Sequence, residues 1–61
     1  MGDEAAVHNN VGTLHHRQGD LAAAVRAYSD AVAADPTQPL LRYNLARAWE
    51  VRERERERES L

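Results

Sequence analysis

The sequence predicts an all-α module, an antiparallel helix hairpin followed by a third helix with a charged C-terminal helical extension. Three observations lead to this prediction. Between residues 20 and 35 the apolar side chains recur every three or four positions, which is the spacing of one helix face. Gly19 and Pro36 flank that segment, and both residue types commonly separate helices. The chain of 61 residues has no cysteine, so packing alone must hold the helices together.

The first two helices are expected at residues 4–18 and 20–35. In the first helix, apolar residues four and three positions apart form a stripe that we expect to face the core, and this stripe comprises Val7, Val11 and Leu14. Gly19 can adopt the left-handed conformation that ends a helix, and the Asp20 side chain can accept from the free backbone N–H groups of the next helix. The sequence therefore predicts a tight turn between two antiparallel helices.

A third helix is expected at residues 38–51. Pro36 cannot donate a helical hydrogen bond and ends the second helix, and Thr37 is the expected cap of the third. The apolar residues of this helix again follow a spacing of four and three, and they are Leu41, Leu45, Ala48 and Trp49. We therefore expect residues 1–51 to form one three-helix module.

Residues 52–61 form a separate segment in which Arg and Glu alternate up to Glu59. If this segment is helical, side chains three residues apart attract and those four apart repel, so the two effects of a few tenths of a kcal/mol partly cancel. Because residues 52–59 include no apolar side chain, they cannot contribute to a core. We expect a solvated helical extension of the third helix. A disordered tail and a charge-paired strip for assembly are the alternatives.

The third helix repeats the sequence pattern of the first. When the chain is displaced along itself until Val7 falls on Leu41, Val11 falls on Leu45 and Asn10 on Asn44. A helix-turn-helix unit with a period of about 34 residues, which this displacement matches, is typical of the tetratricopeptide repeat. The small, aromatic and proline positions of that repeat are occupied here by Gly12, Gly19, Ala24, Tyr28, Ala31 and Pro36. Over about residues 5–51 the chain resembles the tetratricopeptide repeat family, as one and a half repeats with helices A, B and A′.

This resemblance implies a non-enzymatic module for protein–protein interaction that binds a peptide or a partner helix on the face of its A helices. The residues that the resemblance places on this face are Asn9, Thr13, His16, Arg17, Tyr43, Asn44 and Arg47. Asparagine side chains can hydrogen-bond a peptide backbone, and arginines favour an acidic partner. We expect a protein or peptide partner and no cofactor.

A self-assembling structural module is the alternative interpretation. Repeat units bury their faces against neighbours, and about three units are normally needed for a stable array. A chain of one and a half repeats is therefore expected to form a homo-oligomer, most simply a dimer, with or without exchange of helices. The interface is expected on the apolar stripe of the third helix, at Leu41, Leu45 and Trp49.

Other functional classes receive little support. Separations of seven, eight and one residues between His8, His15 and His16 differ from the four of a helical metal pair, so no metal site is expected. Ser29 lies beside Asp30 without a histidine placed to activate it, so no catalytic residues are expected. The net charge of −2 argues against a nucleic-acid partner. Short apolar runs and an acidic start argue against a membrane span and a signal peptide, so a cytoplasmic protein is expected.

Overall fold

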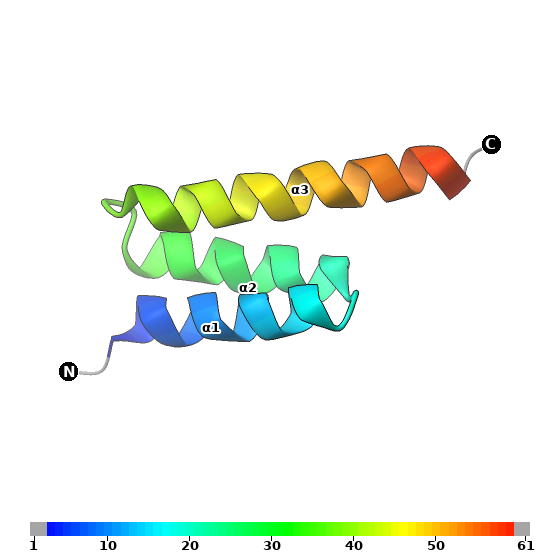
Figure 1. The fold of residues 1–61 in the computed structure, drawn as a ribbon. Helices are drawn as coiled ribbons and strands as arrows, with labels where there is room; N and C mark the ends of the chain where they lie inside the picture. Colours follow the sequence, from blue (N-terminus) through cyan, green and yellow to red (C-terminus); the bar gives the residue numbers. More distant parts are fainter. Residues whose placement is uncertain (1–2, 60–61) are drawn as a thin grey trace.

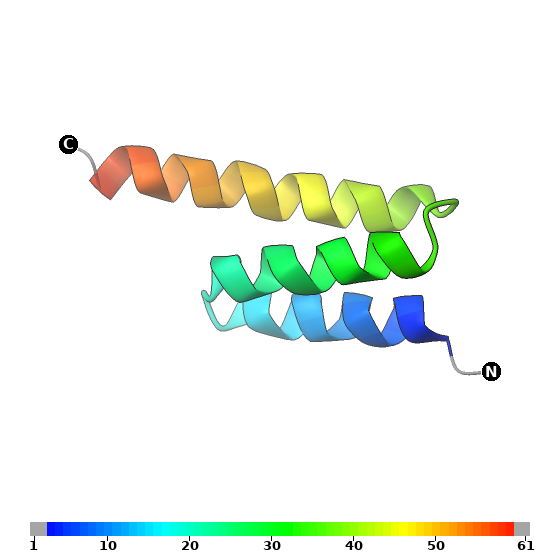
Figure 2. The ribbon, with the colours of Figure 1, turned by 180° about the vertical axis from the view of Figure 1, so that it is seen from behind.

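The computed structural model describes residues 3–59, which form three α-helices. Helices α1 (Glu4–Arg17) and α2 (Leu21–Ala34) make an antiparallel hairpin, and α3 (Pro39–Glu59) packs on α2. In Figure 1, α2 lies between α1 and α3. The view from behind in Figure 2 shows the same order. The predicted all-α class is therefore confirmed, with α2 as the central layer.

The turn between α1 and α2 has the geometry that its sequence indicates. Gly19 has φ +80°, and its N–H donates to the carbonyl of His16 at 3.1 Å. The Asp20 N–H donates to the carbonyl of His15 at 3.0 Å, which completes the Schellman arrangement of a helix end. The Asp20 carboxylate then accepts from the Ala23 N–H at 3.2 Å and caps α2. Both helices lie within one residue of their expected bounds.

Asp35 organises the turn between α2 and α3. Its carboxylate accepts from the Thr37 hydroxyl at 2.6 Å and from the Thr37 N–H at 3.1 Å. The Gln38 side chain donates to the same carboxylate at 2.7 Å. These hydrogen bonds, that of the Thr37 hydroxyl first, lower the pKa of Asp35 from its ordinary value. Thr37, the expected cap of the third helix, thus donates its hydroxyl back to the end of α2.

Helix α3 continues through the Arg/Glu segment to Glu59. Glu50 accepts from Arg54 at 2.8 Å, and Glu53 pairs with Arg56 at 3.6 Å, so neighbouring turns are linked by opposite charges. In Figure 1 this part of α3 runs past the end of α2. The segment is therefore a solvent-exposed helical extension as far as it is described. Residues 1–2, at the start of the expected three-helix module, lie outside the described residues. So do residues 60–61, at the end of the expected charged extension.

The core consists of two small clusters that share α2. The first cluster comprises Ala24, Val25, Tyr28 and Ala48, with the half-buried Leu45 packed against it. The second comprises Ala5, Ala31 and Leu41, with the half-buried Val32. Alanines predominate because a short side chain lets two helix backbones approach. Helix α2 therefore joins α1 and α3 by presenting small residues on both of its sides.

The expectation that Val7, Val11 and Leu14 face the core is wrong. Their exposed fractions are 59%, 40% and 55%. Helix α1 instead buries Ala5 and Gly12 against α2. A Cβ added to Gly12 would lie 2.6 Å from Cδ1 of Tyr28, so only a glycine lets the ring lie this close to the helix. This close approach turns the larger apolar side chains of α1 away from α2.

The apolar stripe of α3 is also partly covered within the chain. Leu41 is 3% exposed and packs with Ala5 and Ala31, and Leu45 packs against the first cluster. Leu41, one of the three residues expected at an oligomer interface, is therefore already buried within the chain. Trp49 retains an exposed fraction of 43%, with the Arg52 guanidinium 5.4 Å from its ring centroid. Of the three residues, Trp49 is the one that remains substantially exposed.

Replacing Gly12 with alanine is expected to lower the free energy of unfolding. The intrinsic helix propensity of alanine would favour the change by about 1 kcal/mol. The buried Tyr28 ring would have to move, however, and overpacking of this kind costs about 1–3 kcal/mol. Thermal denaturation followed by circular dichroism measures the difference. The matched control is Asn10→Ala at an exposed position of α1, which is expected to be neutral or stabilising. A Gly12→Ala variant as stable as this control would contradict the close contact.

Replacing His15 with leucine is expected to raise the thermal midpoint. Among the described residues, Nδ1 of His15 is buried without a hydrogen-bond partner. Leaving a buried polar atom unpaired costs about 1–3 kcal/mol, and a leucine of similar size removes that cost. A gain of about 1 kcal/mol corresponds to a rise of about 4–8 °C in a domain of this size. His8→Leu on the same helix serves as the control, with a smaller rise expected. A lower midpoint for His15→Leu would show that its ring nitrogen is satisfied.

Candidate functional site

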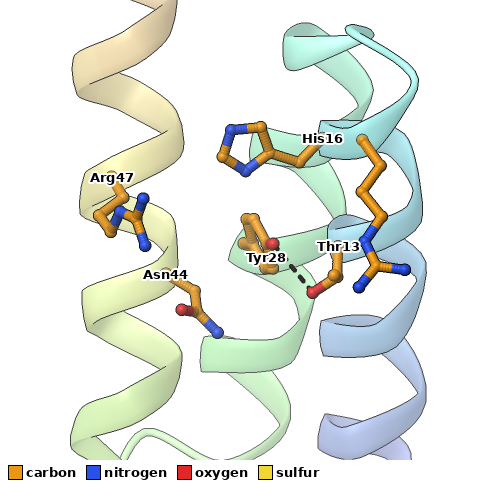
Figure 3. Close-up of a pocket in the computed structure, with 6 residues that line it drawn as sticks. Thr13, His16, Tyr28, Asn44 and Arg47 are labelled. Atoms are coloured by element: carbon orange, nitrogen blue, oxygen red, sulfur yellow. Dashed lines mark hydrogen bonds between the residues drawn. The ribbon is translucent and has the colours of Figure 1, made fainter.

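A cavity of about 320 Å³ lies over Tyr28 of α2, with α1 and α3 on either side. The residues that line it are Thr13, His16, Arg17, Tyr28, Asn44 and Arg47. Figure 3 shows Thr13 and His16 on one side, Asn44 and Arg47 on the other, and Tyr28 between them. All three helices therefore contribute to one polar cavity.

The helical periodicity explains why these side chains meet. Thr13, His16 and Arg17 are three and four residues apart, so they project from one face of α1. Asn44 and Arg47 are three residues apart and likewise share a face of α3. Because α2 holds these two helices on either side of it, the two faces become opposite walls of the cavity.

Hydrogen bonds connect the two walls of the cavity to Tyr28 at its floor and connect the walls to each other. The Thr13 hydroxyl donates to the backbone carbonyl of Asn9 at 3.0 Å, and the hydroxyls of Thr13 and Tyr28 are 3.0 Å apart. Nδ2 of Asn44 donates to Oδ1 of Asn9 at 2.9 Å, a direct link between α3 and α1. The ring of Tyr28 is 3% exposed, so its hydroxyl is held by packing as well as by this bond. The cavity is therefore preorganised at its base.

The cavity is electropositive. Arg17 and Arg47 both line it, and no Asp or Glu side chain does so among the described residues. The Arg47 guanidinium lies 5.7 Å from the ring centroid of Tyr43, a cation–π distance that favours one position of the side chain. Two guanidinium groups on opposite walls favour an acidic group between them.

The structure brings together most of the site residues expected from the sequence. Thr13, His16, Arg17, Asn44 and Arg47 line the cavity. Asn9 lies beside it and is bonded to Asn44, and Tyr43 supports Arg47.

Sequence reasoning missed Tyr28 as a site residue because it assigned the ring to packing alone. The available signal was the hydroxyl group. A phenylalanine would fill the same gap between helices without leaving a polar atom to be satisfied.

Residues 3–59 form neither a metal centre nor a membrane-spanning helix. Their His, Asp and Glu side chains form no group of three or more suited to holding a metal ion. None of the helices described combines the length and the apolar character needed to cross a membrane. The cavity between α1 and α3, by contrast, gathers side chains from all three helices.

Comparison with known families agrees with the internal repeat. The family model described as tetratricopeptide repeat matches residues 5–48. The search of curated proteins and the search of solved structures return no similar chain. The match spans α1, α2 and the first half of α3, which are the helices that enclose the cavity. The chain therefore belongs to the tetratricopeptide repeat family, whose fold typically serves protein–protein interaction.

Proposed function

We propose that this module binds an extended acidic peptide in the cavity between α1 and α3. The observation that carries the proposal is the set of side chains that the three helices present to one cavity, two of which are arginines with no acid beside them. The ligand lies across Tyr28, with the walls of α1 and α3 on either side. In this function the module is a non-enzymatic interaction domain.

The cavity has the polar groups that a peptide requires. Asn44 uses one N–H in its bond to Asn9 and keeps its other N–H and its oxygen, a pair that matches one peptide group of a ligand. Arg17 and Arg47 are exposed, so acidic side chains of the ligand reach them without deep burial of charge. Charge-assisted hydrogen bonds to guanidinium groups are stronger than neutral ones, and they select acidic ligands.

Self-association is a second candidate function, and the exposed stripe of α1 favours it. Val7, Val11 and Leu14 lie on the side of α1 that faces away from α2. Their counterparts one repeat later are the residues through which α3 packs on α2, namely Leu41, Leu45 and Ala48. The same sequence pattern thus packs on α2 where it occurs in α3, and it is left uncovered where it occurs in α1.

A second copy of the chain fits this stripe in an antiparallel arrangement. Val7 of one copy would then contact Leu14 of the other, and the two copies of Val11 would meet on the twofold axis. Three side chains form a small surface compared with a standard interface of about 800 Å² per partner, so the dimer is expected to be weak. Such an interface leaves the cavity between α1 and α3 free, so the two functions are compatible.

The peptide proposal is tested with an array of immobilised acidic, neutral and basic decapeptides. We expect the wild-type module to bind acidic peptides preferentially, and the double variant Arg17→Ala/Arg47→Ala to lose this binding by about tenfold or more, since each lost charge-assisted bond costs about 1.5–3 kcal/mol. Arg26→Ala is the matched control, because Arg26 is an exposed arginine of α2 that does not line the cavity. Equal binding by the wild type and the double variant would rule out the cavity as the site.

The self-association proposal is tested by sedimentation equilibrium over a hundredfold range of concentration. We expect the average mass of the wild type to rise with concentration, and Val11→Asp to remain monomeric because it places two carboxylates at the centre of the interface. Circular dichroism checks that the variant keeps its helices. Ala33→Asp, at an exposed position of α2, is the control and should associate like the wild type. A wild type that stays monomeric throughout would reject this second function.

A further inference from the structure

The donors and acceptors of the cavity are divided between two regions. Its floor is formed by Thr13 and Tyr28, and its rim by His16, Arg17 and Arg47. The Thr13 hydroxyl has a single hydrogen, which it donates to the carbonyl of Asn9 at 3.0 Å. In the 3.0 Å contact between the two hydroxyls, Tyr28 must therefore be the donor and Thr13 the acceptor. Neither hydroxyl has a hydrogen left for a ligand. The Tyr28 oxygen still offers a lone pair, so this part of the floor can only accept.

An anion is consequently disfavoured at the floor and favoured at the rim. An oxyanion beside Tyr28 would meet a lone pair instead of a donor. The donors that remain are the second side-chain N–H of Asn44, the half-buried ring of His16, and the exposed guanidinium groups of Arg17 and Arg47, which alone carry a fixed positive charge. A complementary ligand therefore directs a backbone N–H to Tyr28 and an oxyanion outward to the arginines.

The charge of the rim indicates which oxyanion fits best. Two guanidinium groups carry two positive charges, and no Asp or Glu of the described residues lines the cavity to offset them. A carboxylate carries one negative charge and leaves the second guanidinium uncompensated. A phosphoryl monoester carries about −1.5 to −2 at neutral pH and has three strong acceptor oxygens, so its charge matches that of the two arginines together.

We propose that the cavity recognises a phosphorylated serine or threonine side chain in an extended peptide, with the phosphoryl group between Arg17 and Arg47. This proposal rests on the proposed peptide-binding function and specifies its ligand. The peptide backbone lies over Tyr28 and Asn44, where its N–H can donate to the free lone pair of the Tyr28 oxygen. The rim arginines then distinguish the modified peptide from the unmodified one.

Peptides that differ in a single side chain test this proposal. The probe is the decapeptide Gly-Ala-Ala-Ala-X-Ala-Ala-Ala-Ala-Tyr with both ends blocked, in which X is phosphoserine, serine or glutamate. A fourth peptide has serine at X and a free C-terminal carboxylate, and inorganic phosphate is titrated separately. Binding is followed by two-dimensional NMR of the ¹⁵N-labelled module, which gives the Kd and the affected residues. We expect the phosphoserine peptide to bind at least about tenfold more tightly than each of the other ligands.

Two variants connect this preference to the rim. Arg17→Gln/Arg47→Gln is expected to abolish the preference for phosphoserine, whereas Arg26→Gln should retain it because Arg26 lies outside the cavity. Circular dichroism confirms that each variant is folded. Tyr28→Phe removes the hydroxyl from the floor without changing a charge, so it should weaken the binding of all the peptides alike.

The outcomes separate this proposal from the function on which it rests. Equal affinities for phosphoserine and glutamate, or a preference that survives in the double variant, would overturn the phosphoryl proposal and leave peptide binding standing. Inorganic phosphate that binds as tightly as the phosphoserine peptide would identify an anion site without peptide recognition. Binding of none of the peptides would overturn both proposals.

Discussion

The contact between Gly12 and the ring of Tyr28 is the constraint on which the rest of the structure depends. The ring occupies space that any side chain on residue 12 would need, with 2.6 Å between Cδ1 and the position of a Cβ. This contact holds α1 close to α2 and fixes the rotation of α1 about its axis. The Tyr28 hydroxyl then reaches Thr13, and the face of α1 that carries His16 lines the cavity. The glycine at position 12 thus determines both how α1 packs on α2 and which face of α1 lines the cavity.

The same rotation explains why the apolar stripe of α1 is uncovered. With Gly12 turned toward α2, the stripe formed by Val7, Val11 and Leu14 faces outward. At the other end of the three layers, Trp49 remains partly exposed beside the helical extension of α3. Exposed apolar patches on small proteins commonly mark contact surfaces. The molecule therefore presents apolar surfaces at its two outer layers and a polar, cationic cavity between α1 and α3.

Most of the fold was predictable because its signals are local. Gly19, Asp20 and Pro36 mark the ends of helices through their own backbone chemistry, and the internal repeat relates α3 to α1. Periodicity failed for α1, however, since it shows that a helix has an apolar face and does not show which neighbour covers that face. Gly12 has no side chain and therefore does not count in an apolar pattern. Its contact with Tyr28 nevertheless determines which face of α1 packs on α2.

The site was predictable only in part, and for a different reason. The residues of α1 and α3 were inferred from the family resemblance, which places the A helices along one face. Tyr28 was not predicted because the direction of its hydroxyl depends on how α2 is rotated between its neighbours. The division of the cavity into an accepting floor and a cationic rim follows from individual hydrogen bonds, which no sequence pattern specifies.

Helix α2 holds α1 and α3 as the two walls of one cavity, which we propose as the peptide site. Paramagnetic relaxation enhancement from a spin-labelled acidic peptide tests it most directly, since the label broadens the amide signals of the residues that it approaches. We expect broadening at Thr13 and His16 of α1 and, at the same time, at Asn44 and Arg47 of α3. Broadening confined to one of these helices, or centred on Val11 at the outer face of α1, would contradict it.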